Sequence, residues 1–527
     1  MLARLVAPQM RHVERRLLIS GVALGLALWT TAAAAQQPQP ATGGPTTKAE
    51  AKPAEAENPE DLSELDGLYV IVEATQRPLD GALVLPPACG PLRHLCEPVR
   101  AILHNDLRLS GVVRALELPA ATVSAINKYA PPNFEINRKP AQAAEVVYAI
   151  GTWLRRARDF PGMVELQVAV IDARNGKLLN LGRHATLRGP PSRLRTLVHR
   201  AANAVFGALT GVMGSFDSQL FYSAPLKGRC SRCIWLADAD GHNARVIVGD
   251  DSIHMLPRQT LDAGLNYVSF RTGLPSLFRL SGPQVDLIAG AAANLVSPAP
   301  ELAAPTKRDK TKGKPVEPVA IKPVPFAADP DLQFRTAAES VKGQIAATVN
   351  DGEQADIWLL NKAGRPVLNL TKDDADDLGP SWSPDGSMLA FVSDRSGSPQ
   401  IYVVGIDGSG LQRLTFVGRY NTGPDWGPSG KIVYSGLRGQ AVDILTIDMS
   451  KQMQRLTPGK GRRSLEPSWS PCGRRVVYVS DEDGQSPRLW IASHDGAVRQ
   501  PLAVPGARYY TPAWRRKPGQ LPQPFVP

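Results

Sequence analysis

The residues of this chain best suited to chemistry are two cysteine pairs. Cys230 and Cys233 form a Cys-x-x-Cys motif, and Cys89 and Cys96 are near neighbours. A zinc site needs about four ligands, and no second pair of Cys or His residues with suitable spacing accompanies Cys230. A redox-active pair usually opens a helix, whereas the apolar run 234–236 is typical of a strand. The spacing therefore leaves two interpretations open for Cys230 and Cys233, a local disulfide or two free thiols.

Other catalytic motifs are incomplete or missing. The run Asp238-Ala239-Asp240-Gly241 resembles the start of a calcium loop, but the glutamate expected at the twelfth position is absent, and we interpret the run as a turn. The sequence has no Gly-x-Ser-x-Gly nucleophile elbow and no His-Glu-x-x-His zinc motif. We therefore expect no catalytic residues, no metal and no cofactor.

The amino terminus has the pattern of an export signal. Four arginines precede an apolar run at 17–29, and three alanines at 33–35 follow it. This pattern predicts a cleaved signal peptide over 1–35 and a periplasmic mature protein that does not span a membrane. An uncleaved anchor stays open as an alternative, because residues 17–35 could nearly span a bilayer.

The positive charge of the chain is concentrated in two segments. Of the formal charge of +11, the signal carries +3 from four arginines and one glutamate. The segment 306–323 carries +4 from six basic and two acidic residues, so +4 is left for the rest. A remainder this small is typical of a solvated surface, and we expect no nucleic-acid partner.

Composition and periodicity divide the mature chain into four parts. Residues 36–64 are rich in Pro, Ala, Glu and Lys and predict a disordered arm. Residues 65–214 predict an α/β domain, with strands at 68–72, 145–150 and 164–171 and helices within 94–116 and 191–209. A tail at 517–527 ends the chain after a long repeated region at 215–516.

The repeated region carries one turn motif several times. The motif Trp-Ser-Pro-Asp-Gly at Trp382 returns in related form at Trp426 and Trp469, and Trp514 closes the series. A period of 40 to 50 residues marks propeller blades, and each repeat holds four short strand patterns. We predict an all-β six-bladed propeller of WD40-like (PD40) repeats over 215–516. The strand 510–514 would complete the first blade, and residues 290–326 would form an inserted basic loop.

A propeller binds partners with the loops and inner strands around its central channel. The innermost strand of each blade should end at the tryptophan turn, so we predict that residues shortly before each tryptophan line the channel mouth and bind a partner. These candidate residues are Asp377, Leu378, Tyr420, Thr422, Leu465, Glu466, Tyr509, Tyr510 and Thr511. The repeat tryptophans themselves should pack between blades.

The repeat and the α/β segments together resemble the TolB family. The stretch 380–415 is a nearly complete copy of that family's repeat, and Asn105 to Gly111 resembles its Asp-Leu-x-x-Ser-Gly helix end. The strand-turn-strand at 171–179 and the junction at 210–217 match in the same order. The resemblance covers nearly all of residues 65–515. The arm at 36–64 and the basic segment at 306–323 depart from the family pattern.

The resemblance implies a function as well as a fold. It implies a monomeric, non-enzymatic component of the periplasmic Tol–Pal system, which supports outer-membrane integrity and cell division. The propeller of that family binds the peptidoglycan-associated lipoprotein Pal, and the mature amino terminus contacts TolA. Because the arm at 36–64 has no counterpart in the family, a TolA contact through this arm or the α/β domain is only an implication of the resemblance. Two alternatives stay open, an exported propeller hydrolase or lactonase and a glycan-binding module.

Overall fold

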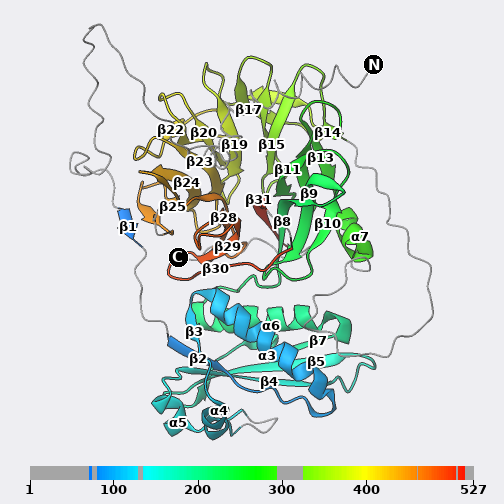
Figure 1. Cartoon of the computed structure of the whole chain (residues 1–527), viewed down its shortest axis with the longest axis vertical. Coiled ribbons are helices and arrows are strands. Elements are labelled where there is room, and N and C mark those ends of the chain that lie inside the picture. The colour runs from blue at the N-terminus through cyan, green and yellow to red at the C-terminus, as the bar shows by residue number, and fades with distance from the viewer. Residues whose placement is uncertain are drawn as a thin grey trace, which may run out of the picture.

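The computed structural model describes residues 71–73, 80–128, 134–292, 325–457, 459, 461–505 and 508–516. The predicted signal peptide, the predicted arm, the basic segment 306–323 and the tail lie outside the described residues. Figure 1 shows a propeller with a smaller α/β domain beside it. None of the described helices has both the length and the apolar character needed to cross a bilayer.

The α/β domain places two long helices against one mixed sheet. Its order begins β2 (Asp80–Val84), η4 (Gly90–Leu95), α3 (Cys96–Ser110), β3 (Val113–Ala115), α4 (Ala120–Ile126) and α5 (Arg138–Ala143). It continues with β4 (Tyr148–Arg156), β5 (Val164–Asp172), β6 (Lys177–Leu178), η5 (Gly182–Ala185), β7 (Thr186–Gly189), η6 (Pro191–Arg193) and α6 (Leu194–Thr210). The strand order is β3-β2-β4-β5-β6, and β7 also pairs with β5. The strand predicted at 164–171 lies within β5. The one predicted at 145–150 begins too early, because Glu145 has φ 55° and the strand β4 starts only at Tyr148.

The helix predicted within 94–116 is α3, which ends at Ser110 because Gly111 adopts φ 67° and turns the chain toward β3. A second prediction in this domain needs correction. Of the strand expected at 68–72, only Ile71 and Val72 are among the described residues, and they do not join the sheet of this domain. The structure instead has β1 (Ile71–Glu73), which pairs in parallel with β26 (Met453–Arg455) of the propeller. The sequence pattern showed a strand but carried no information about which sheet edge it joins.

The propeller consists of six small antiparallel sheets among the described residues, which confirms the predicted fold. Blade 1 contains β8 (Gln219–Leu226), β9 (Cys230–Asp238), β10 (Arg245–Val248) and β31 (Tyr510–Arg515). Blade 2 contains β11 (His254–Gln259), β12 (Leu265–Ser269), β13 (Ser276–Leu280) and β14 (Pro325–Ala327). Blade 3 contains β15 (Gln333–Glu339), β16 (Ile345–Asn350), β17 (Ala355–Leu360) and β18 (Pro366–Asn369).

The remaining three blades follow the same plan. Blade 4 contains β19 (Asp377–Trp382), β20 (Met388–Ser393), β21 (Gln400–Gly405) and β22 (Gln412–Arg413). Blade 5 contains β23 (Asn421–Trp426), β24 (Ile432–Arg438), β25 (Ala441–Ile447) and β26, with β1 on its outer edge. Blade 6 contains β27 (Ser464–Trp469), β28 (Arg475–Ser480), β29 (Arg488–Ser493) and β30 (Arg499–Pro501).

The chain closes the ring in the way that the repeat predicted. Strand β31 comes from the end of the chain and pairs antiparallel with β8, from Tyr510 opposite Ser223 to Arg515 opposite Gln219. In blade 2, the helix α7 (Gly282–Ala292) leaves β13 and packs Val285 into the apolar cluster beside β12. We did not predict this helix. Strand β14 then resumes the blade at Pro325, so the predicted inserted loop joins the third and fourth strands of blade 2.

The repeat tryptophans connect neighbouring blades. The indole N–H of Trp382 donates to the carbonyl oxygen of Ala338 in blade 3 (3.0 Å). Trp514 donates in the same way to Ser468 of blade 6 (2.9 Å). Both tryptophans are buried, at 7% and 5% exposure. A buried indole N–H favours such a partner, and these two bonds fix the inner strands of blades 4 and 1 against the preceding blade. Trp426 instead donates within its own turn to Gly430 (3.1 Å), and the indole N–H of Trp469 has no partner among the described residues.

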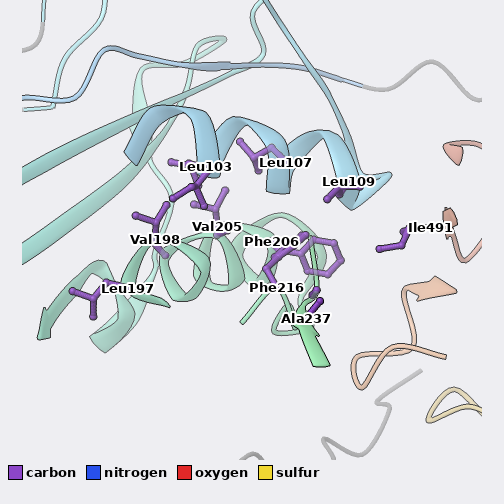
Figure 2. Packing of buried hydrophobic residues seen from close by; sticks show 14 of the residues in the cluster. Leu103, Leu107, Leu109, Leu197, Val198, Val205, Phe206, Phe216, Ala237 and Ile491 are labelled. Atoms are coloured by element: carbon purple, nitrogen blue, oxygen red, sulfur yellow. The ribbon is translucent and has the colours of Figure 1, made fainter. Parts of the chain in front are cut away.

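One hydrophobic core joins the two domains. Figure 2 shows Leu103 and Leu107 of α3 facing Val205 and Phe206 of α6, with Phe216 beside them. The rings of Phe206 and Phe216 meet edge to face at 5.8 Å. The same cluster includes Ala237 and Ile491 of blades 1 and 6 and Trp514 of the closing strand. The α/β domain is therefore packed onto the propeller through shared apolar burial.

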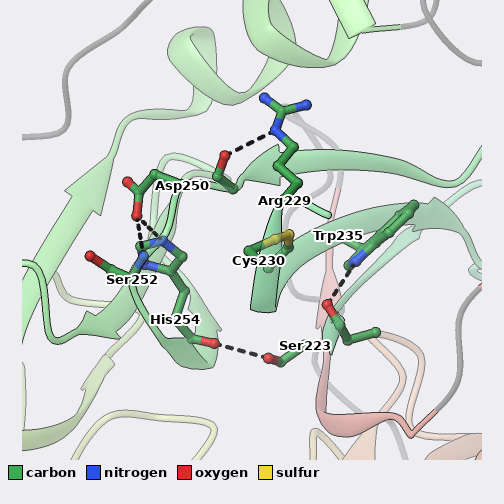
Figure 3. The surroundings of a disulfide bond; sticks show 10 residues. Ser223, Arg229, Cys230, Trp235, Asp250, Ser252 and His254 are labelled. Carbon is green, nitrogen blue, oxygen red and sulfur yellow. Dashed lines mark hydrogen bonds and ion pairs between the residues drawn. A yellow bond between two sulfur atoms is a disulfide. The ribbon is translucent and has the colours of Figure 1, made fainter. Parts of the chain in front are cut away.

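The structure pairs both sets of neighbouring cysteines. Cys89 is bonded to Cys96, and Cys230 is bonded to Cys233, with Cα atoms 5.9 and 5.8 Å apart. The second pair joins the start of β9 within blade 1 (Figure 3). Trp235, further along the strand, donates its indole N–H to the carbonyl oxygen of Ala224 (3.1 Å). Of the two interpretations left open by the sequence, the structure has the local disulfide.

Candidate interaction site of the propeller channel

The innermost strands share a backbone irregularity that shapes the channel. Five of them break register in their middle, next to a residue with positive φ that precedes a proline. These residues are Leu256, Gly379, Gly423, Glu466 and Thr511, with φ between 44° and 65°. A bulge of this kind bends the strand and redirects the side chains that follow. We call the part before the bulges the amino end of the channel and the part after them the tryptophan end.

The predicted partner-binding residues lie before or at these bulges, toward the amino end of the channel. Five of the nine are buried, with exposures of 8% or less: Asp377, Leu378, Leu465, Tyr509 and Thr511. Tyr420, Thr422, Glu466 and Tyr510 are half-buried. Leu378 packs in the apolar cluster shared by blades 4 and 5, and the ring of Tyr509 lies 5.9 Å from that of Tyr222. Leu378 and Tyr509 thus support the channel wall from behind.

Glu466 is one of the two acidic residues of the predicted set. It accepts a hydrogen bond from the backbone N–H of Thr511, while its own N–H donates to Ser435 of blade 5 (3.1 Å). Burial raises the pKa of Glu466, and Arg232 and Arg258 oppose this rise. The structure therefore brings Glu466 and Thr511 together across the boundary between blades 6 and 1. It also presents an acceptor inside a cationic part of the channel.

Asp377 is the second acidic residue of the predicted set. It is fully buried, and one oxygen accepts a hydrogen bond from Arg395 (2.8 Å). Its other oxygen has no hydrogen-bond partner among the described residues. Burial raises the pKa of Asp377 to about 6 against the influence of Arg395. The side chain therefore orients Arg395 rather than facing a partner directly.

Two aromatic residues offer contact area at the amino end. The guanidinium of Arg232 lies 4.6 Å from the ring centre of Tyr510, which places a cation over an aromatic face. Tyr420 borders a depression of about 710 Å³ together with Asp373, Asp394 and Arg395. Tyrosine and arginine are frequent anchors in protein interfaces. The amino end of the channel thus has the residue types expected for protein recognition.

A separate cavity of about 650 Å³ lies at the tryptophan end. Its lining includes Trp382, Trp426, Trp469 and Trp514, several prolines and serines, and the two arginines Arg258 and Arg516. None of the nine predicted residues lines it. The bulges explain this separation, because the predicted residues lie before the bulge in each strand and the cavity lining lies after it.

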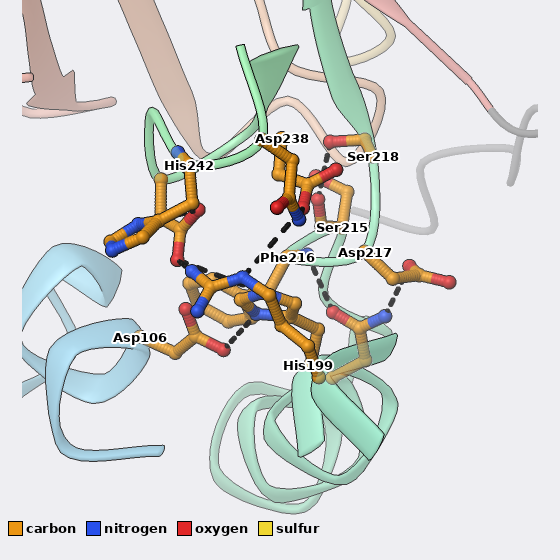
Figure 4. Close-up of polar contacts among 12 residues, drawn as sticks. Asp106, His199, Ser215, Phe216, Asp217, Ser218, Asp238 and His242 are labelled. Atoms are coloured by element: carbon orange, nitrogen blue, oxygen red, sulfur yellow. Dashed lines mark hydrogen bonds and ion pairs between the residues drawn. The ribbon is translucent and has the colours of Figure 1, made fainter. Parts of the chain in front are cut away.

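A buried polar cluster lies at the junction of the two domains. His199 of α6 lies between Asp106 of α3, 2.7 Å from its Nδ1, and Asp240 of blade 1, 3.6 Å from its Nε2 (Figure 4). Arg195 of α6 forms an ion pair with Asp240. All three of Asp106, His199 and Asp240 are nearly inaccessible. The two carboxylates raise the pKa of His199 against the effect of burial, and burial raises the pKa of Asp106.

This cluster has the residue types of a metal site, since one atom from each of Asp106, His199 and Asp240 lies within 4.8 Å of the others. The guanidinium of Arg195 already supplies a cation to Asp240, and we assign no metal to it. Sequence reasoning did not find this cluster. The three residues are far apart in the chain, and Asp240 was recognised only as part of a turn.

Comparisons with known proteins place this geometry in context. A family model described as "TolB beta propeller domain" matches residues 340–517. The Tol-Pal system protein TolB of Bordetella pertussis and that of Bordetella bronchiseptica are each 30% identical over 329 residues, 62% of this chain and 66% of the relative. The Protein TolB homolog of Chlorobium chlorochromatii is 32% identical over 249 residues, 47% of this chain and 46% of the relative. The chain thus spans just under two thirds of the length of its Bordetella relatives.

A solved structure supports the fold over a larger part of the chain. The crystal structure of TolB from Acinetobacter baumannii matches with a TM-score of 0.65 at 22% identity. The match covers 84% of this chain and 98% of that chain, and so includes both the α/β domain and the propeller. At this identity the match shows a shared fold.

Proposed function

This chain belongs to the TolB family, and from that premise we propose that it is a periplasmic component of the Tol–Pal system that binds other proteins and is not an enzyme. The names of its relatives support a role in that system, because they are Tol-Pal system proteins. The predicted signal peptide over 1–35 supports the periplasmic location. By extension, the chain would support outer-membrane integrity and cell division.

We further propose that the partner is a peptidoglycan-associated lipoprotein of the Pal type, bound at the amino end of the channel. The observation that carries this proposal is the grouping of Glu466, Thr511 and Tyr510 around the inner strands of blades 6 and 1. Arg232 and Tyr510 offer a cation and an aromatic face, and Glu466 offers an acceptor. Tyr420 and Thr422 extend the same surface over blade 5, while the buried predicted residues hold its shape.

A second contact, with TolA, would use the arm 36–64 or the α/β domain. The family resemblance is the support for this contact, and the arm lies outside the described residues. Deleting residues 36–64 from the mature chain separates the two routes. Loss of TolA binding in a pull-down would assign the contact to the arm, and retained binding would assign it to the α/β domain. A mature chain that fails to bind TolA would refute the contact.

The Pal proposal can be tested by titrating the mature chain with the purified soluble domain of the Pal lipoprotein from the same organism. We expect Glu466→Gln and Tyr510→Ala each to weaken binding by about tenfold or more, as for hot-spot residues in other interfaces. Tyr148→Ala in the α/β domain is a matched tyrosine control and should bind like the unaltered chain. If the unaltered chain shows no specific binding, or if neither variant changes the affinity, the proposed partner or surface is wrong.

A further inference from the structure

The cavity at the tryptophan end of the channel holds two arginines without an ionic partner. Arg258 lies in β11 of blade 2, and Arg516 directly follows β31 of blade 1. The backbone N–H of Arg516 donates to Oε1 of Gln259 (2.9 Å), so the two arginines come from adjoining strands. Among the described residues, neither guanidinium makes an ion pair or a hydrogen bond. Burial lowers the pKa of Arg516, which shows that its charge is poorly solvated.

The acidic residues in the cavity wall are engaged elsewhere. Glu339 accepts a hydrogen bond from Arg279 (2.7 Å). Asp425 accepts one from the backbone N–H of Trp469 (2.6 Å), which joins blades 5 and 6. Asp385 is bound by the hydroxyl groups within its own turn. Glu466 influences Arg258 only at longer range, because no contact within 4 Å joins them. Bonds from these neutral donors leave Asp385 and Asp425 charged, so the cavity carries both signs, and Arg258 and Arg516 are cations of its wall that contact no carboxylate among the described residues.

Two arginines that line one concave site favour a ligand with carboxylates. Arginine binds carboxylates through paired N–H donors, and such charge-assisted bonds are stronger where water is partly excluded. The rest of the wall includes indole, proline and serine surfaces and the three carboxylates named above, around about 650 Å³, a volume in the range of ligand sites. Walls of aromatic residues suit extended, proline-containing peptides.

We propose that this cavity is a second binding site, which takes a short acidic segment of a partner protein through Arg258 and Arg516. The site differs from the proposed Pal surface, since none of the nine residues predicted for partner binding lines the cavity. No described residue of the α/β domain lines it. The carboxylates of the ligand would pair with the two guanidinium groups, and its backbone would lie along the tryptophan and proline surfaces.

The probe for this proposal is a hexapeptide of alternating proline and glutamate with both ends capped. Its counterpart carries glutamine in place of glutamate. Isothermal titration against the mature chain, with the fluorescence of the cavity tryptophans as a second readout, should show binding of the glutamate peptide that weakens with added salt. Arg258→Gln and Arg516→Gln should each weaken it at least tenfold. Arg365→Gln, on an exposed turn of blade 3, is the matched control and should change nothing.

Several outcomes would overturn the proposal. Equal affinity for the glutamate and glutamine peptides would remove the role of charge, and unchanged binding by both arginine variants would remove the site. Binding of inorganic phosphate in place of the peptide would indicate a free-anion site. Thermal melts of each variant exclude misfolding as the cause of a loss. Tyr510→Ala, which tests Pal binding, should retain peptide binding, so the two proposals can fail separately.

Discussion

Replacing His199 with glutamine should remove a pH-dependent contribution to the packing of the two domains. In the folded chain this imidazole touches Asp106 of the α/β domain and faces Asp240 of the propeller. The two carboxyl groups raise its pKa against the effect of burial, which favours the charged form of the imidazole at this position. Two arginines lie nearby. Arg195 forms an ion pair with Asp240 and opposes the protonation of His199, and Arg475 interacts electrostatically with Asp106 and Asp240. Glutamine keeps a hydrogen-bond donor but loses the charge.

The magnitude follows from the burial of this cluster. Removing one partner of a buried ion pair costs about 3 to 5 kcal/mol of folding stability. Because glutamine keeps a hydrogen-bond donor, we expect His199→Gln to lower the free energy of unfolding by about 3 kcal/mol at pH 6. Because the folded pKa lies above the unfolded value of about 6.5, the stabilisation is complete below pH 6.5. It is lost at about 1.4 kcal/mol per pH unit as the pH rises toward the folded pKa. The raised pKa of Asp106 acts in the same direction.

Urea unfolding from pH 5.5 to 9, followed by tryptophan fluorescence, measures this effect. The free energy of unfolding of the unaltered chain should fall above pH 6.5, and that of His199→Gln should start lower and change less. His254→Gln is the control. Burial lowers the pKa of that fully buried histidine to about 4 even though Asp250 lies 2.9 Å from its Nε2. It should therefore contribute no slope above pH 6.5, and its variant should keep the slope of the unaltered chain.

The reasoning would be refuted by parallel stability curves. If the unaltered chain and His199→Gln differ by a constant amount at every pH, His199 is neutral in the folded state and contributes only packing. If His254→Gln removes the slope instead, the titrating group lies in the propeller and not at the junction. Arg195→Gln offers a second check. It removes the opposing cation and should raise the pKa of His199 further, which moves the loss of stability to higher pH.

Two more predictions concern the backbone. Gly111→Ala should destabilise the chain by about 2 to 3 kcal/mol, since φ of 67° disfavours a side chain and the new methyl group would collide with Ser493 of blade 6. Gly211→Ala, at φ 77° in open space, is the control and should cost only about 1 kcal/mol. Equal losses for the two variants in urea melts would contradict the steric argument. A chain ending at Tyr509 lacks β31 and should lose cooperative unfolding, whereas one ending at Arg516 keeps the strand and should unfold cooperatively.

The propeller was accessible to sequence reasoning because its information is local. A turn of the form Trp-Ser-Pro-Asp-Gly uses proline to set φ and glycine to accept positive φ, as Gly386 does at 67°. When such a turn recurs about every 44 residues, the blade count and the closing strand follow from the spacing. Two turns of this kind are degenerate in blades 2 and 3, where the β-rich runs alone indicated the strands.

The domain junction was not accessible in the same way. Asp106 and His199 lie on separate helices 93 residues apart, and nothing in either helix pattern distinguishes a buried charge from a solvated one. The pairing of β1 could not be predicted from the sequence for the same reason, because its partner strand lies almost 400 residues away. Long-range pairing of this kind depends on the assembled surface and not on a local propensity.

The channel residues fall between these cases, and the reason is the bulge in the inner strands. Side chains alternate between faces along a regular strand, so counting back from each tryptophan should give those that face the channel. A bulge inserts one residue and shifts the alternation of everything before it. Glu466 and Thr511 occupy the bulge itself, whereas Leu378 lies before it and packs between blades. The bulge has a mark in the sequence, because the bulged residue precedes a proline in five of the six inner strands. In blade 3 the bulged residue is Arg335, which no proline follows. A channel prediction for such a ring should therefore count from the proline and not from the tryptophan.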